Sequence, residues 1–168
     1  GNLAIALEET GDVDRARNLL VEAISLCREQ RIRVLLVTCL SNLGGLVMNE
    51  GQLELASQLF REALEVGHEI NDIRALINTL PMVSALINRL GHPDDARALL
   101  DTIDKLVVDT GLPLTAGSLS AYRQARQETM SEPLPSDAIS TVERGVSLDA
   151  TVARALELIP DEQLSMPG

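Results

Sequence analysis

Apolar and small residues recur along this chain with a period of 40 residues. The segments GDVDRARNLL, GQLELASQLF and GHPDDARALL begin at Gly11, Gly51 and Gly91. Nine residues after each of these glycines stands a leucine or a phenylalanine. A fixed period of this length is the signature of a repeat architecture, in which each unit buries its apolar face against the next. The pattern predicts an all-α fold, a solenoid of stacked helical hairpins.

Small residues at two positions of each copy indicate how the helices pack. They are Ala16, Ala56 and Ala96 after the glycines, and Ala4, Gly44 and Ser84 before them. A small side chain lets two antiparallel helices approach closely, while larger apolar side chains fill the space between hairpins. We expect helices over residues 13–29, 33–49, 53–69, 73–90 and from Pro93 to Gly111. Asp72 is expected to cap the fourth of these helices. Pro81 predicts a kink in the fourth, because proline removes a helical hydrogen bond.

The second copy resembles the tetratricopeptide repeat in Leu43, Gly44, Val47, Gly51, Ala56, Phe60 and Ala63. The resemblance covers residues 1 to about 110 and implies a right-handed α-solenoid of about three hairpins, with residues 1–111 as the repeat region. Gly1 aligns with Ser41 inside a helix, so we expect a truncated first repeat and a fragment of a longer array. The period exceeds the usual length of about 34 residues, and His68 stands where a proline is usual. The shorter HEAT-type repeats are therefore the alternative.

Residues 112–160 depart from the period, and we expect them to form helices that cap the array. The pattern predicts an amphipathic helix over residues 116–129, a linker at SEPLPSD, and a short helix ending near Glu143. Ser147 is expected to cap a last helix that Pro160 ends. Residues 161–168 are expected to fray.

The tail GLPLTAGSLSAYRQA, from Gly111, and the run ERGVSLDATVARALEL, from Glu143, resemble the ends of repeat regions in large bacterial signalling ATPases. These include LuxR-like transcriptional regulators of the maltose-activator type. The resemblance implies a sensor or protein-interaction arm beside an ATP-binding switch domain. The tryptophan frequent in the last helices of that family is missing here.

The amino-acid composition limits the kinds of partner that the chain can bind and the compartment in which we expect it. Asp and Glu number 25 against 14 Lys and Arg, a net charge of −11, which argues against direct binding to nucleic acid. The longest apolar stretch falls short of the roughly 18 residues of a membrane span. Cys27 and Cys39 lack a metal-site spacing and are expected to be buried free thiols in a reducing compartment. We therefore expect a cytoplasmic location.

No catalytic motif is found in the sequence, so we expect no enzymatic activity and no cofactor. The single lysine, Lys105, does not belong to a phosphate-binding loop. His68 and His92 lack a metal-ligand spacing and are expected at the surface. The alternative is a helical enzyme with an acidic metal site at Asp94, Asp95 and Asp101, although the first two carboxylates are explained by a helix N-terminus.

The remaining candidate is a binding groove lined by the first helix of each hairpin, as the resemblance implies. Amide side chains there can recognise a peptide backbone, because each supplies a donor and an acceptor. The expected partner is a protein or peptide segment, a second copy included, or a small effector. Other readings are a structural or dimerising scaffold and a free-standing adaptor. The expected exposed positions are Thr38, Ser41, Asn42, Gly45, Asn49, Asn78, Met82, Ala85, Asn88 and Arg89.

Overall fold

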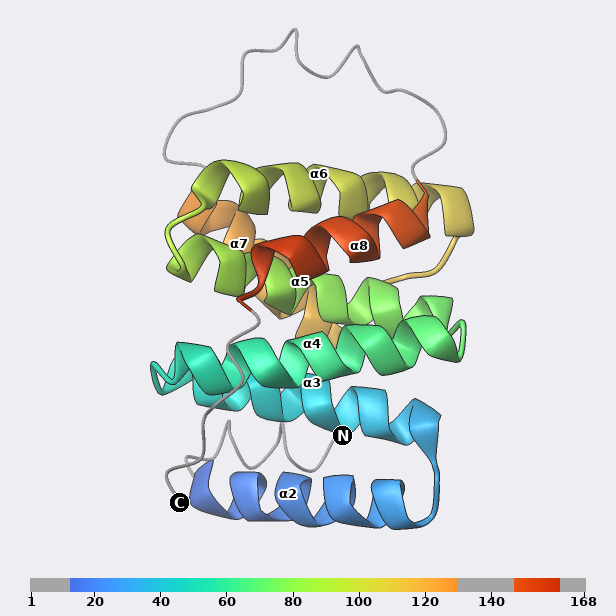
Figure 1. Ribbon diagram of the computed structural model, residues 1–168. Helices are drawn as coiled ribbons and strands as arrows, with labels where there is room; N and C mark the ends of the chain where they lie inside the picture. Colours follow the sequence, from blue (N-terminus) through green and yellow to red (C-terminus); the bar gives the residue numbers. More distant parts are fainter. Residues whose placement is uncertain (1–12, 130–146, 161–168) are drawn as a thin grey trace, which may run out of the picture.

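The computed structural model describes residues 13–129 and 147–160, and this part of the chain consists of seven α-helices without a strand (Figure 1). Consecutive helices from α2 to α7 are joined by short connections and form stacked hairpins, which confirms the predicted fold class. The helices are α2 (Val13–Glu29), α3 (Arg33–Asn49), α4 (Leu53–Glu69), α5 (Ile73–Arg89), α6 (Pro93–Thr110), α7 (Ala116–Thr129) and α8 (Leu148–Leu158).

The turns between the helices repeat every 20 residues, half the period of the sequence. A residue with positive φ follows each helix from α2 to α6, namely Arg31, Gly51, Asn71, Gly91 and Gly111. After each of α2 to α5, the next N–H donates to the carbonyl five residues earlier, as in Ile32 to Cys27 and Gln52 to Val47. This is the hydrogen bond of a Schellman C-cap. The same turn therefore sets the length of every helix from α2 to α5.

Glycines mark the closest approaches between helices. A Cβ atom added to Gly44 would lie 2.9 Å from Cε1 of Phe60, which is fully buried in the same hairpin. A Cβ added to Gly67 would lie 2.9 Å from Cδ2 of Leu76, in the next hairpin. Large side chains thus fill the places that the glycines leave, within a hairpin and between hairpins.

Helix α5 begins at Asp72, whose carboxylate accepts a hydrogen bond of 3.0 Å from the Ala75 N–H. The cap was expected from the sequence. The α-helix continues through the buried Pro81 and ends at Arg89, one residue before the predicted end. The kink predicted at Pro81 stays a prediction.

Helix α7 continues the array instead of ending it. It packs against α5 and α6, and its last residue, Thr129, stands 40 positions after the last residue of α5. Ser118 Oγ donates to the Asn78 carbonyl at 2.8 Å, which ties α7 to α5. The proposed division at residue 111 stays a prediction, but the helical period itself runs on to Thr129.

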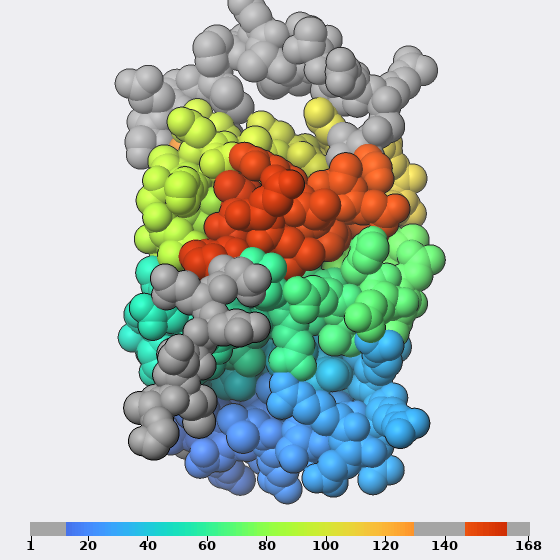
Figure 2. All heavy atoms as spheres, in the orientation of Figure 1, coloured from blue at the N-terminus to red at the C-terminus, as the bar shows by residue number. Residues whose placement is uncertain are grey.

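Helix α8 takes a different place. It packs against α4, α5 and α6, and in Figures 1 and 2 it lies across the front of the molecule, between α6 and α4. Helix α8 thus packs on both helices of the last predicted hairpin, α5 and α6, and also reaches α4 of the hairpin before it. The expectation that residues 112–160 cap the array stays a prediction. The predicted linker, the short helix near Glu143, the first helix and the frayed tail lie outside the described residues.

Candidate functional site

The first helices of two consecutive hairpins, α3 and α5, lie side by side and carry most of the predicted groove. We call their polar surface the α3–α5 face. Thr38 and Asn49 are exposed on α3, and Asn42 and Gly45 are half-buried. On α5, Asn78, Met82, Asn88 and Arg89 are half-buried, and Arg74 is exposed. A Cβ added to Gly45 would lie 3.4 Å from Met82 Sδ, so the two helices meet closely at this point.

Two predicted groove positions are not exposed. Ser41 is 4% exposed and Ala85 is 6% exposed. Ser41 Oγ donates to the Val37 carbonyl at 2.9 Å and lies 2.8 Å from Thr79 Oγ1, so its hydroxyl is satisfied inside the protein. The expectation that these two residues line a groove in contact with solvent is therefore wrong.

Two other predicted residues hold the helices together. Arg89 donates to the Met48 carbonyl at 2.7 Å and to Asn49 Oδ1 at 3.2 Å, across from α5 to α3. Asn78 Nδ2 donates to the Arg74 carbonyl at 2.8 Å, and its Oδ1 accepts from the Thr115 N–H at 2.7 Å. The amide of Asn78 is thus occupied in the junction with α7, and a ligand cannot use both of its polar atoms without disturbing that junction.

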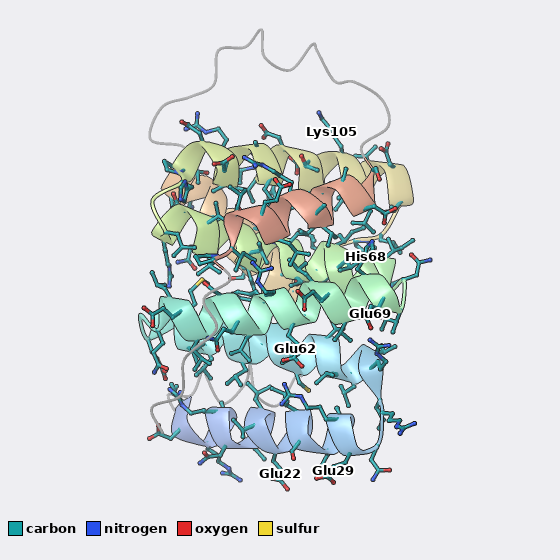
Figure 3. The ribbon with its side chains drawn as sticks, in the orientation of Figure 1. Glu22, Glu29, Glu62, His68, Glu69 and Lys105 are labelled. Carbon is teal, nitrogen blue, oxygen red and sulfur yellow. The ribbon has the colours of Figure 1, made fainter. Side chains whose placement is uncertain are left out.

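Among the helices from α3 to α8, charge is distributed unevenly between the odd-numbered and the even-numbered helices. Helices α3, α5 and α7 contain five arginines and one acidic residue, Glu128. Helices α4, α6 and α8 contain eleven acidic and four basic residues. Figure 3 shows Glu62 and Glu69 on α4, on the side of the molecule that α8 covers. The α3–α5 face is therefore free of carboxylates from its own helices in a chain of net charge −11.

Not all of these arginines are available to a ligand. Arg33 pairs with Glu69, and Arg126 pairs with Asp101 at 2.6 Å and with Asp104. Partial burial opposes the charge of Arg126, but hydrogen bonds with Tyr122 and Asp101 outweigh it and raise the pKa of the guanidinium. Arg74 on α5 and Arg123 on α7 are exposed. They are the cations that a bound segment can reach most easily.

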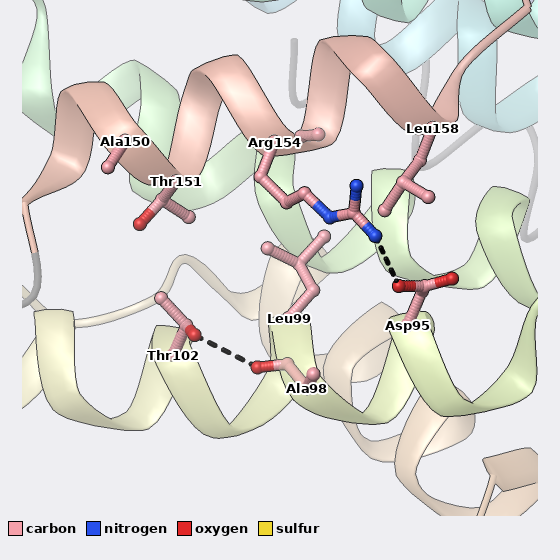
Figure 4. Close-up of a pocket in the computed structure, with 9 residues that line it drawn as sticks. Asp95, Ala98, Leu99, Thr102, Ala150, Thr151, Arg154 and Leu158 are labelled. Atoms are coloured by element: carbon pink, nitrogen blue, oxygen red, sulfur yellow. Dashed lines mark hydrogen bonds and ion pairs between the residues drawn. The ribbon is translucent and has the colours of Figure 1, made fainter.

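A cavity of about 220 Å³ lies between α6 and α8, away from the predicted groove. Figure 4 shows its floor at Leu99 and the ion pair of 2.8 Å between Arg154 and Asp95 at one end. Thr102 and Thr151 stand toward the other end. No sequence signal pointed to this cavity, because its two walls are 59 residues apart at the ion pair.

The alternative metal site is not assembled. Asp95 pairs with Arg154 and Asp101 pairs with Arg126, so the two carboxylates are directed at different arginines. Within residues 13–129 and 147–160, no group of three His, Cys, Asp or Glu side chains could hold a metal ion. The same residues include no helix of the length and apolarity that a bilayer crossing requires.

His68 and His92 are exposed, as expected. Cys27 and Cys39 are free and buried, as predicted. Burial raises the pKa of the Cys39 thiol, and the neighbouring Cys27 raises it further. A buried neutral thiol of this kind is a packing residue and not a nucleophile.

Comparison with known proteins agrees with this geometry. Residues 1–29 and 36–71 match the tetratricopeptide repeat family. No curated protein and no solved structure matches the chain significantly. Tetratricopeptide repeats generally mediate protein–protein interaction and are generally non-catalytic. These two segments are thus similar to tetratricopeptide repeats, in agreement with the resemblance found in the sequence.

Proposed function

We propose that this chain is a non-catalytic interaction module that binds a protein segment along the α3–α5 face. The observation that carries this proposal is the segregation of charge, which leaves the α3–α5 face without a carboxylate from α3 or α5. Like charges repel strongly where two surfaces meet, so most of this acidic molecule repels an acidic partner. A face without carboxylates can bind such a partner.

The same distribution indicates the chemistry of the segment. Arg74 and Arg123 favour a segment that is neutral or acidic, and nothing on α3 or α5 would attract a basic one. Asn42 and Asn88 can exchange hydrogen bonds with a peptide backbone, and the thioether of Met82 adapts to apolar side chains. We expect the partner to lie across both helices, contacting Thr38 and Asn42 on one and Met82 on the other.

The setting that we propose is a multidomain bacterial regulator in the cytoplasm, in which the module senses an effector or a partner protein. This part rests on the resemblance of the runs from Gly111 and from Glu143 to the repeat regions of signalling ATPases. The sequence of the complete gene product tests it. A phosphate-binding loop or a DNA-binding domain in the same polypeptide would support the regulator, whereas further repeats alone would indicate a free-standing adaptor.

Binding is tested by displaying random dodecapeptides to the full chain and mapping the selected peptides by NMR chemical-shift changes. We expect selected peptides to carry acidic or neutral residues and to shift the amides of α3 and α5. Arg74→Glu should weaken their binding about tenfold, since it replaces an attractive charge with a repulsive one. Lys105→Glu makes the same charge change on α6 and serves as the control.

Selected peptides that are basic, or that bind equally to Arg74→Glu and wild type, would contradict the proposal. Failure of every peptide to bind, together with a constant dimer mass in light scattering, would favour the second candidate, a dimerising scaffold. Robust ATP hydrolysis by the purified chain would contradict a non-catalytic role.

A further inference from the structure

Helix α8 is bound to the surface formed by α4, α5 and α6, which we call the α8 furrow. Its apolar residues Val152, Ala155 and Ile159 are 2%, 0% and 1% exposed. Ala155 lines the cavity between α6 and α8, together with Leu99 of α6. The helix thus buries one narrow apolar face and leaves Ala153 and Arg154 exposed on the other. This is the way in which an amphipathic helix occupies a groove.

Polar contacts fix the direction of α8 in the furrow. Arg61 of α4 donates to the carbonyls of Leu156, at 3.0 Å, and of Ile159, at the C-terminal end of α8. His68, two turns further along α4, lies 3.1 Å from Asp149 Oδ1 at the N-terminal end. A cation at the C-terminus and an acid in the first turn both suit the helix dipole. The furrow therefore recognises a helix antiparallel to α4.

The main packing partners of α8 do not include α7, the helix that precedes it. They are α4, α5 and α6, whereas α7 packs on α5 and α6. Residues 130–146 join α7 to α8 and, fully extended, 17 residues span at most about 60 Å. The groups that hold α8, Arg61, His68 and Asp95, belong to the repeats. They make the same contacts with an α8 from any copy of the chain.

We infer that the α8 furrow accepts α8 from a second copy of this chain, so that two copies pair by reciprocal exchange of α8. The exchanged dimer keeps every contact of α8, and only the polypeptide that supplies the helix changes. Docking within one copy is favoured because the helix and its furrow belong to one polypeptide, which raises their effective concentration. Exchange is therefore promoted by a high concentration of the protein, because the contacts of α8 are the same in both forms and only exchange requires two copies to meet.

The first test offers α8 in trans as a fluorescent peptide of residues 147–160. Val152→Asp and Ile159→Asp together should release the chain's own α8 in the full-length protein, since each places a carboxylate in a buried position. We expect the peptide to bind this variant at least about tenfold more tightly than wild type, whose furrow is occupied. Adding Arg61→Ala should abolish the gain. Absence of binding to a folded release variant would overturn the inference.

The second test uses the ion pair between Asp95 and Arg154, and needs no release of α8. Asp95→Arg alone and Arg154→Asp alone each place like charges against each other within one copy. In an exchanged dimer of the two variants, both furrows contain an opposite pair again. We expect an equimolar mixture to form a species of twice the 18.1 kDa chain mass, and each variant alone to form about tenfold less of it.

The double variant, with both substitutions in one chain, restores the pair within a copy and is the control that should behave as wild type. If the double variant is restored but the mixture forms no more dimer than its components, α8 is confined to its own chain and the inference is wrong. The peptide selection on the α3–α5 face is independent of both tests, so failure of one proposal leaves the other standing.

Discussion

Gly44 and Gly45 are adjacent in α3 but face different neighbours, and this difference is measurable. Gly44→Ala would place Cβ 2.9 Å from the buried Phe60 ring, whereas Gly45→Ala would place it 3.4 Å from the end of the flexible Met82 side chain. Overpacking costs about 1–3 kcal/mol, and alanine regains about 1 kcal/mol of helix propensity. We expect Gly44→Ala to destabilise the protein by up to about 2 kcal/mol and Gly45→Ala to be neutral or stabilising in urea unfolding. Equal effects would show that Phe60 can move.

The buried thiol of Cys39 should make the protein less stable at alkaline pH. Burial, then the neighbouring Cys27, raises its pKa above the ordinary value of 9.0. The neutral thiol is favoured in the folded state, so its contribution is complete below pH 9 and is lost as the pH rises toward the folded pKa. We expect the unfolding free energy to fall as the pH rises above 9.

Unfolding curves of wild type, Cys39→Ala and Cys27→Ala at pH 8, 9 and 10 check this expectation. Cys39→Ala should flatten the pH dependence, whatever its effect on stability at pH 8. A slope that is unchanged in Cys39→Ala would place the titrating group elsewhere, with Tyr122 as the next candidate, since burial and its hydrogen bond to Asp104 raise its pKa as well.

At the scale of elements, equivalent helix starts differ in their caps. The carboxylate of Asp72 caps α5, whereas Gln52, at the start of α4, makes no side-chain cap bond. Asp72→Ala should therefore cost about 1 kcal/mol, and Gln52→Ala less than about half of that. Thermal or urea unfolding of the two variants gives the comparison. A similar loss of stability at both positions would mean that the side-chain cap adds nothing, and that the Schellman turn of the preceding helix is enough to fix where the next helix starts.

The sequence located these elements well because their signals are local. Asp72 was expected as a cap, and the bounds of α2, α3 and α4 agree with the predicted ranges. The prediction of which side chains are buried and which are exposed was less accurate. Ser41 was placed in the groove as a polar residue, but its hydroxyl bonds to Val37 and lies beside Thr79 of the next hairpin. A polar side chain satisfied by a neighbour 38 residues away gives no sign of its burial in the sequence.

At the scale of the whole molecule, stability should not be uniform. Helix α4 contributes the fully buried Phe60 and Leu64 to the core, whereas α8 lies on the outside of the array. Local openings cost least where few buried contacts are broken. We expect the amides of α8 to exchange with solvent at least about tenfold faster than those of α4 in native-state hydrogen exchange. Equal protection would mean that α8 unfolds only with the whole array.

The sequence by itself determined the repeat, its period, the helices from α2 to α6 and the small residues at which they meet. These features depend on neighbours within one hairpin or the next, and the 40-residue period reports them directly. Tertiary structure alone decided that α7 extends the array, that α8 packs across α4, α5 and α6, and that a cavity forms between α6 and α8. Contacts such as Arg61 with Ile159 join residues 98 positions apart. No local pattern encodes such a pairing, because it is set by which surfaces of the folded array remain to be covered.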